Sequence, residues 1–207
     1  MTSVALGFRA HSGWTAAVAV AGSYPSGTVI DRRRIELVDE RTSRSLQPYH
    51  AAAEMKFVEA EKWVKRCIDR TQALAHQAVR ALIDELGKKG HRVVACGVVL
   101  ASGRALPPLE TILAAHPLIH TAEGELFRNA LSSAGKQCGV AVTGVKEREL
   151  YARASAELGV QEDELRRRLA DLGKALGPPW RQDEKSATLA AWLALAAAER
   201  NLRADRA

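Results

Sequence analysis

The stretch SVALGFRAHSGWTAAVAVAGSYPSGTVIDRRRIELV, residues Ser3–Val38, decides the fold. It contains three runs that predict β-strands, over Ser3–Phe8, Trp14–Ala21 and Thr28–Val38, because apolar or β-branched residues fill each run and turn residues separate them. Since the connections are short, the three strands are expected to form an antiparallel meander. The charged middle of the third run predicts an exposed or edge strand.

Helices and two further strands follow this meander. No Gly or Pro interrupts Pro48–Leu86, and apolar residues recur there every three or four positions, which predicts a long helix. A straight helix of that length would exceed a compact domain, so it must bend or project. Two further strands are predicted over His91–Leu100 and Gly139–Thr143. A short helix is predicted between Pro107-Pro108 and His116-Pro117, and a longer one is capped by Thr121 and ends at Gly135. The last three predicted helices cover Lys146–Leu158, Glu162–Leu172 and Glu184–Asn201, the last of them capped by Asp183.

Strands that follow helices join a sheet in parallel, through right-handed crossovers. The sequence therefore predicts an α/β protein with a five-stranded mixed sheet: three antiparallel strands, then parallel additions, with helices on both faces. No internal repeat or low-complexity linker divides the chain, so residues 1–207 are expected to form a single domain.

Composition narrows the function classes. The 207 residues carry 30 Lys and Arg against 24 Asp and Glu, a net charge of +6 that is compatible with a nucleic-acid partner without requiring one. Three dispersed Cys without a C-x-x-C pair predict neither a disulfide framework nor a structural zinc site. The first residues lack the pattern of a signal peptide, and the longest apolar stretch, Ala187–Ala198, is too short to span a bilayer. We therefore expect a cytoplasmic protein without membrane contact.

Three segments of the chain resemble the RuvC-type Holliday-junction resolvases of the ribonuclease H-like superfamily. Leu6–Trp14 is similar to the first strand and turn of that family, and His91–Gly103 to its fourth strand. Asp183–Ala187 is similar to the start of its last helix. The resemblance implies a ribonuclease H-like fold, a bacterial source and, for an active member, metal-dependent cleavage of phosphodiesters by carboxylates that hold Mg²⁺ or Mn²⁺.

The catalytic acids that the resemblance implies are degenerate in this chain. The first-strand Asp would fall at Arg9, whose guanidinium repels a metal ion. The fourth-strand acid would fall near Gly97 or Val98, in a strand without any carboxylate. The last helix keeps Asp183, but the second acid of that pair is Ser186. One carboxylate cannot organise two metal ions, so standard two-metal nuclease chemistry is not expected, and whether the protein is an enzyme stays open.

A ligand site is still expected at one end of the sheet, because open α/β sheets bind ligands beyond the carboxyl ends of their strands. The residues predicted there are Arg9, His11, Ser12, His50, Glu54, Ser102, Arg104, Lys146, Glu147, Trp180, Asp183 and Lys185. For ligand binding we select Arg9, His11, Ser12, Lys146 and Lys185. Trp180 fits a lid on the last helix better than a platform for a base.

His50 and Glu54 stand four residues apart, on one face of a helix. With Asp183 they form a candidate catalytic set, in which Glu54 and Asp183 would ligate the metal if one binds. The alternatives are a solvated helix start and, at Asp183, an ion pair with Arg9 in place of a metal site.

Two basic runs, Arg32-Arg33-Arg34 and Arg166-Arg167-Arg168, are candidate contacts to DNA or RNA phosphates. Acidic residues 162–164 neutralise the second run, which leaves the first as the better candidate. A projecting end of the long helix would suit a homodimer.

The leading interpretation is therefore a nucleic-acid or partner-binding module with a degenerate resolvase-like site. The alternatives are a metal-dependent nuclease with relocated acids, among them Glu54, Glu147 and Asp183, and a nucleotide-binding relative of the actin-like group.

Overall fold

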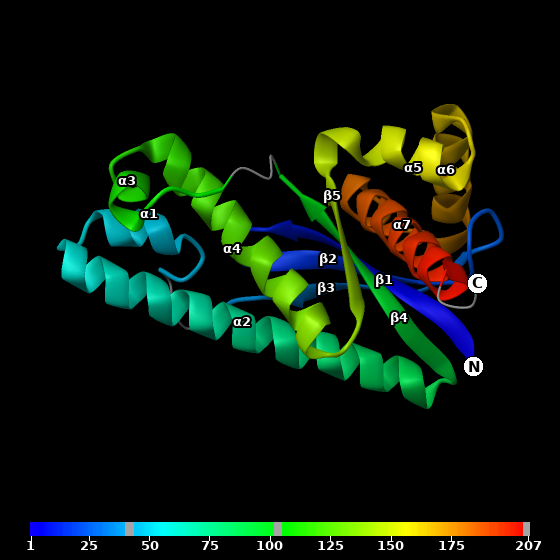
Figure 1. The fold of residues 1–207 in the computed structure, drawn as a ribbon, viewed down its shortest axis with the longest axis horizontal. Coiled ribbons are helices and arrows are strands. Elements are labelled where there is room, and N and C mark those ends of the chain that lie inside the picture. Colours follow the sequence, from blue (N-terminus) through cyan, green and yellow to red (C-terminus); the bar gives the residue numbers. More distant parts are fainter. Residues whose placement is uncertain (40–43, 102–104, 205–207) are drawn as a thin grey trace.

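The computed structural model describes residues 1–39, 44–101 and 105–204, and its five strands form one mixed sheet (Figure 1). The strand order is β3-β2-β1-β4-β5, with β1–β2 and β2–β3 antiparallel and β1–β4 and β4–β5 parallel. The strands are β1 Thr2–His11, β2 Trp14–Ala21, β3 Thr28–Glu36, β4 His91–Leu100 and β5 Ala141–Lys146. The predicted fold class is confirmed, and β3 is an edge strand as expected.

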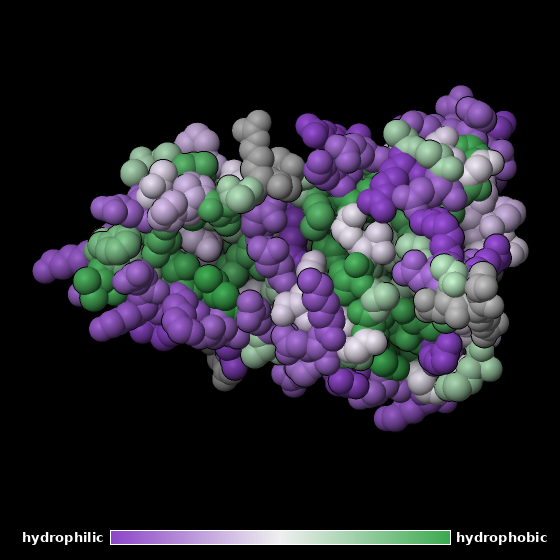
Figure 2. All heavy atoms as spheres, viewed as in Figure 1, coloured by the Kyte–Doolittle hydropathy of each residue, from purple (hydrophilic) through white to green (hydrophobic). Residues whose placement is uncertain are grey.

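Helices cover both faces of this sheet (Figure 1). The helices are α1 Pro48–Ala53, α2 Phe57–Lys88, α3 Leu109–Leu113, α4 His116–Gln137, the 3₁₀ turn η1 Glu147–Glu149, α5 Leu150–Leu158, α6 Glu162–Leu176 and α7 Gln182–Ala204. Strand residues alternate between the two layers, since side chains of a strand point to opposite faces. Leu6 and Phe8 pack with α2 and α4, whereas Ala5 packs with α5, α6 and α7. Figure 2 shows apolar residues gathered in the region of β4, β5 and α7, with hydrophilic residues around them.

Two glycines in register let α7 lie directly on the sheet. Gly7 of β1 pairs with Gly97 of β4. A Cβ built on Gly7 would stand 1.8 Å from the carbonyl oxygen of Ala187, and one on Gly97 would stand 2.0 Å from that of Ala190. Any side chain at these positions would push α7 away. The close packing places the first turn of α7 beside the end of β1.

The long helix predicted over Pro48–Leu86 is interrupted between Ala53 and Phe57 instead of bending as one continuous helix. It divides into α1 and α2, and Lys56 adopts an extended backbone at the start of α2 (φ −63°, ψ 145°). The break lets α1 fold back, and the indole Nε1 of Trp63 donates to the carbonyl of Pro48 at 3.0 Å. Helix α2 still has 32 residues, which is about 48 Å of helix.

Two predicted helix starts were wrong. Helix α4 begins at His116, so Thr121 lies inside it, where its hydroxyl donates to the carbonyl of Pro117 at 2.9 Å. Pro117 suits the first turn because its missing N–H has no helical partner there. Asp183 is likewise inside α7, and the carboxylate of Glu184 accepts the backbone N–H of Arg181 at 2.7 Å.

Within the described part of the chain, no helix is both long and apolar enough to cross a membrane.

Candidate functional site

Several segments meet at the carboxyl end of the sheet. Strands β1, β3, β4 and β5 all end there, because β1, β4 and β5 are parallel and β3 is related to β1 through two antiparallel pairings. The two-residue turn Ser12-Gly13 joins β1 to β2 at this end, with Ser12 exposed and Gly13 at φ +83°. The start of α7 closes the set, as its packing on Gly7 and Gly97 requires.

Arg9 makes the best-defined contact at this end. Its Nε and Nη2 donate to both carboxylate oxygens of Glu147, with N–O distances between 2.9 and 3.2 Å. Its Nη1 donates to the carbonyl of Ala10 at 2.7 Å. A fork-to-carboxylate arrangement of this kind fixes both side chains more strictly than a single contact does. The expected partner of Arg9 was Asp183, and that prediction was wrong.

Asp183 pairs instead with His11. The ring nitrogen Nε2 of His11 lies 2.9 Å from the Asp183 carboxylate. The imidazole also stacks on Trp14, with ring centroids 4.3 Å apart and planes 10° apart, and the guanidinium of Arg34 lies 4.1 Å from the Trp14 ring centroid. Asp183 lies in the first turn of α7, where the helix dipole stabilises a negative charge.

Further cations surround these two pairs. The ammonium of Lys146 stands 3.5 Å from Glu149, whereas the side chain of half-buried Lys185 makes no hydrogen bond or ion pair with the described residues. Arg128 of α4 interacts electrostatically with both Arg9 and Glu147. The pKa of Arg128 is lowered, chiefly because burial disfavours the charged guanidinium. The end of the sheet thus combines paired carboxylates with additional basic groups.

Other predicted members of this site lie elsewhere. Trp180 packs against Gly173 of α6, and its Nε1 donates to the carbonyl of Leu169 at 2.7 Å. Ser102 and Arg104 lie outside the described residues.

The structure divides the predicted catalytic set between two places. Figure 1 shows α1, which carries His50, and the start of α7, which carries Asp183, on opposite sides of α4. Glu54 directly follows α1, is exposed and lies 3.5 Å from Arg44. His50 turns to Glu123 of α4, whose carboxylate lies 2.9 Å from Nδ1. Glu54 and Asp183 therefore do not share a metal position.

Arginines of the basic run on β3 make contacts within the protein. Arg32 donates to the carbonyls of four successive residues, 176–179, before α7. Arg33 pairs with Asp31 at 2.6 Å and with Glu85 at 2.8 Å. The second run is also engaged, because Arg166 lies over the Tyr151 ring at 4.0 Å. The expected preference for the first run as a phosphate contact has no support in this arrangement.

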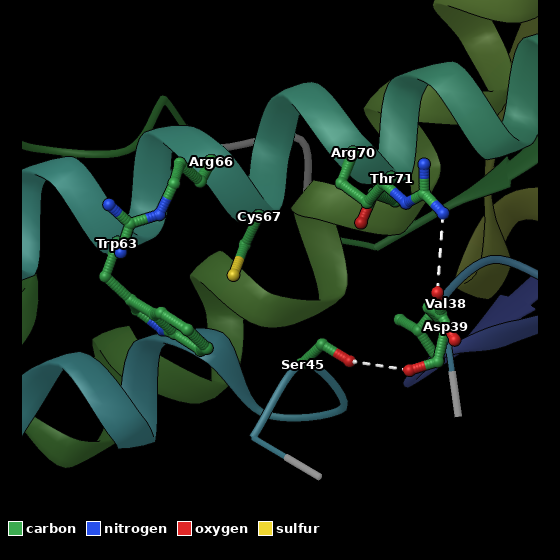
Figure 3. A pocket seen from close by; sticks show the side chains of 8 residues that line it. All are labelled: Val38, Asp39, Ser45, Trp63, Arg66, Cys67, Arg70 and Thr71. Carbon is green, nitrogen blue, oxygen red and sulfur yellow. Dashed lines mark hydrogen bonds and ion pairs between the residues drawn. The ribbon is translucent and has the colours of Figure 1, made fainter. Parts of the chain in front are cut away.

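A separate hollow of about 280 Å³ lies between α2 and the segment after β3 (Figure 3). Trp63, Arg66, Cys67, Arg70 and Thr71 line it from α2, opposite Val38, Asp39 and Ser45. Burial raises the pKa of the Cys67 thiol, which disfavours its reactive thiolate form at neutral pH.

Comparisons with known proteins give a structural relationship. No protein-family model and no curated protein matches the sequence. The Thermus thermophilus RuvC structure matches at a TM-score of 0.53 and 10% identity, and the match covers 96% of each chain. The chain has the fold of RuvC. T. thermophilus RuvC in complex with Holliday junction substrate matches with the same score, identity and coverage.

A two-metal centre of the kind implied by the resemblance to RuvC does not fit the donor set at the sheet end. Glu147 already accepts a guanidinium and Asp183 already pairs with an imidazole. Metal-binding carboxylates need free oxygen lone pairs, and Arg9 adds a positive charge where cations would sit. Within the described ranges, the one group of three or more potential ligands is His50, His116 and His120, near α1.

Glu123 and Arg128, which both lie on α4, are site residues that the sequence did not predict. A helix that starts near Thr121, as predicted, would place Glu123 in a solvated first turn. The observed helix starts at His116 and places Glu123 on its buried face. One signal was available: His116 and His120 are four residues apart, the spacing at which helical side chains share a face.

Proposed function

We propose that this RuvC-like protein binds nucleic acid at the carboxyl end of its sheet and does not cut it by two-metal chemistry. The observation that carries the proposal is the pairing of two carboxylates of that end with side chains of β1: Glu147 pairs with the guanidinium of Arg9, and Asp183 with the imidazole of His11. The same paired end retains basic groups that face solvent.

Two observations support binding. The RuvC structure that matches over 96% of each chain was determined with a Holliday junction, so the fold has a surface suited to branched DNA in that protein. In this chain Lys146, Arg148 and Lys185 stand at the carboxyl end of the sheet, and the Arg148 side chain is 73% exposed. Lys and Arg groups of this kind supply the salt-dependent part of nucleic-acid affinity.

The pairing of the Glu147 and Asp183 carboxylates supports binding without cleavage. In two-metal hydrolysis, several carboxylates hold the ions that activate water and stabilise the leaving oxygen. Replacing that set by a guanidinium–carboxylate pair removes the metal ligands but keeps a site that is polar and rich in hydrogen-bond donors. A phosphate could contact such a site, whereas a metal-bound water could not form in it.

The test is a fluorescence-anisotropy titration of a labelled four-way junction and of a linear duplex of equal length at several salt concentrations. The double variant Lys146→Glu/Lys185→Glu should bind at least about tenfold more weakly and show a salt slope lower by about two. The matched control is Lys88→Glu/Lys89→Glu, which makes the same charge change beside the start of β4, at the opposite end of the sheet. The control should stay within about twofold of the unmodified protein. An affinity that does not change with salt concentration, or an equal loss of affinity in both double variants, would overturn the proposal.

A further inference from the structure

Three imidazoles meet where α1 lies against the first turns of α4. His50 belongs to α1, and His116 and His120 share one face of α4. Their ring centroids are 4.5 to 5.2 Å apart, and one nitrogen of each ring lies within 4.8 Å of the others. Figure 1 shows these two helices side by side, away from the start of α7. This cluster, the three-histidine cluster, is separate from the sheet end.

The spacing of two of these nitrogens suits a metal. The Nε2 atoms of His50 and His116 are 3.4 Å apart. A tetrahedral zinc ion with nitrogen ligands at about 2.05 Å holds its ligand atoms about 3.3 Å apart. His120 is exposed, so a change of rotamer can bring its nitrogen to the same distance.

Glu123 orients His50 for this role. Its carboxylate, with a side chain only 4% exposed, accepts from Nδ1 of His50 at 2.9 Å and from the backbone N–H of His50 at 3.2 Å. Because an ionised carboxylate only accepts, the ring proton sits on Nδ1 and the lone pair sits on Nε2, directed at His116. Carboxylates that hold a metal-binding imidazole in this way are typical of histidine metal sites.

We propose that His50, His116 and His120 bind one divalent transition-metal ion, zinc in the first place, with Glu123 as a positioning residue. Imidazole nitrogen favours zinc, copper or nickel over magnesium, which takes oxygen ligands. The expectation of no structural zinc site rested on cysteine spacing and did not consider histidines. The ion would join α1 to α4 directly.

Three protein ligands leave a fourth position for water or an anion. A hollow of about 260 Å³ adjoins His50 and is lined also by Arg44, Gln47, Ala51 and Glu54. This hollow beside His50 holds one cationic side chain, Arg44, and one acidic side chain, Glu54. This site is independent of the nucleic-acid site proposed above, so each proposal can fail alone.

The test is a calorimetric titration of the chelator-treated 207-residue chain with ZnCl₂ at neutral pH, and with MgCl₂ as the control ion that prefers oxygen ligands. One zinc ion should bind per chain, and its binding should raise the melting temperature. The double variant His116→Ala/His120→Ala should lose at least about 100-fold in affinity, and the matched control His76→Ala, in the middle of α2, should lose none. Because both replaced side chains are exposed, the double variant should keep the circular dichroism spectrum of the unmodified protein.

Glu123→Gln separates positioning from ligation. It should weaken zinc binding about 10- to 100-fold, and the cobalt-substituted protein should keep the visible absorption bands of a four-coordinate site. The proposal is overturned if the unmodified chain binds no zinc, or if the double variant still binds one zinc ion with unchanged affinity.

Discussion

Arg9 and Glu147 join the ends of two strands that are not neighbours. Arg9 lies near the end of β1, Glu147 directly follows β5, and β4 runs between them. Their two-pronged contact, at 2.9 to 3.2 Å, spans the part of the sheet that the resemblance to resolvases assigns to metal-binding acids. This relationship is the observation on which the proposal of binding without two-metal cleavage rests.

Replacing Glu147 by Gln should release Arg9 as a phosphate contact. We expect junction affinity to rise several-fold and the salt slope to become steeper by about one, because one more cation can displace counterions. The Glu147 side chain is 47% exposed, so stability should fall by no more than about 1 kcal/mol. An anisotropy titration measures the first effect, and an unchanged affinity would show that Arg9 does not face the bound strand.

Asp183→Asn should destabilise the protein modestly. The substitution removes the partner of His11 and a favourable charge from the first turn of α7, which together contribute about 1 kcal/mol. The melting temperature should fall by about 2–4 °C, and less at high salt. The control is Asp84→Asn, which removes the same charge from the last turns of α2. Because an acid there opposes the helix dipole, this variant should not lose stability. A loss as large in the control would argue against the assigned role of Asp183.

Gly97→Ala should be costly because a Cβ there would meet the carbonyl oxygen of Ala190 at 2.0 Å. Lifting α7 from the sheet is expected to cost about 1–3 kcal/mol of unfolding free energy. The matched control is Gly87→Ala in α2, where a Cβ meets no atom within 4 Å and better helix propensity should stabilise by about 0.5–1 kcal/mol. Urea denaturation of both variants gives the comparison. Equal effects would contradict the close packing of α7.

Cys96 should resist alkylation in the folded protein. It is fully buried, and burial raises the pKa of its thiol to about 12, so the reactive thiolate is not populated near pH 8. The unfolded chain has an ordinary thiol, so its thiolate fraction rises through pH 8–9 while that of the folded state does not, and stability should fall as pH rises through this range. Mass spectrometry after iodoacetamide treatment should find Cys96 modified only in denaturant. Rapid labelling of the native protein would contradict its burial.

Local patterns were enough to predict most of the elements. The continuous apolar runs Trp14–Ala21 and His91–Leu100, with turn residues around them, predicted both strands with their observed bounds. The start of α4 differs from the prediction because Pro117 occupies the first turn of α4, whereas the sequence pattern places His116-Pro117 at the end of the preceding helix.

The contacts of the site could not be predicted in the same way. They join residues far apart in the chain: Arg9 and Glu147 are separated by 138 positions, and His50 and Glu123 by 73. Which acid reaches Arg9 depends on the register of β5 on β4 and on the close approach of α7, and neither leaves a local pattern. The i, i+4 spacing of His116 and His120 was the one local signal of the three-histidine cluster.

The most direct measurement incubates the protein with an end-labelled four-way junction and millimolar Mg²⁺ or Mn²⁺, then divides each sample between a native and a denaturing gel. We predict a shifted band on the native gel and full-length strands on the denaturing gel with either ion. Shortened strands from the unmodified protein that are lost with Asp183→Asn, or the absence of any shifted band, would contradict the proposed function.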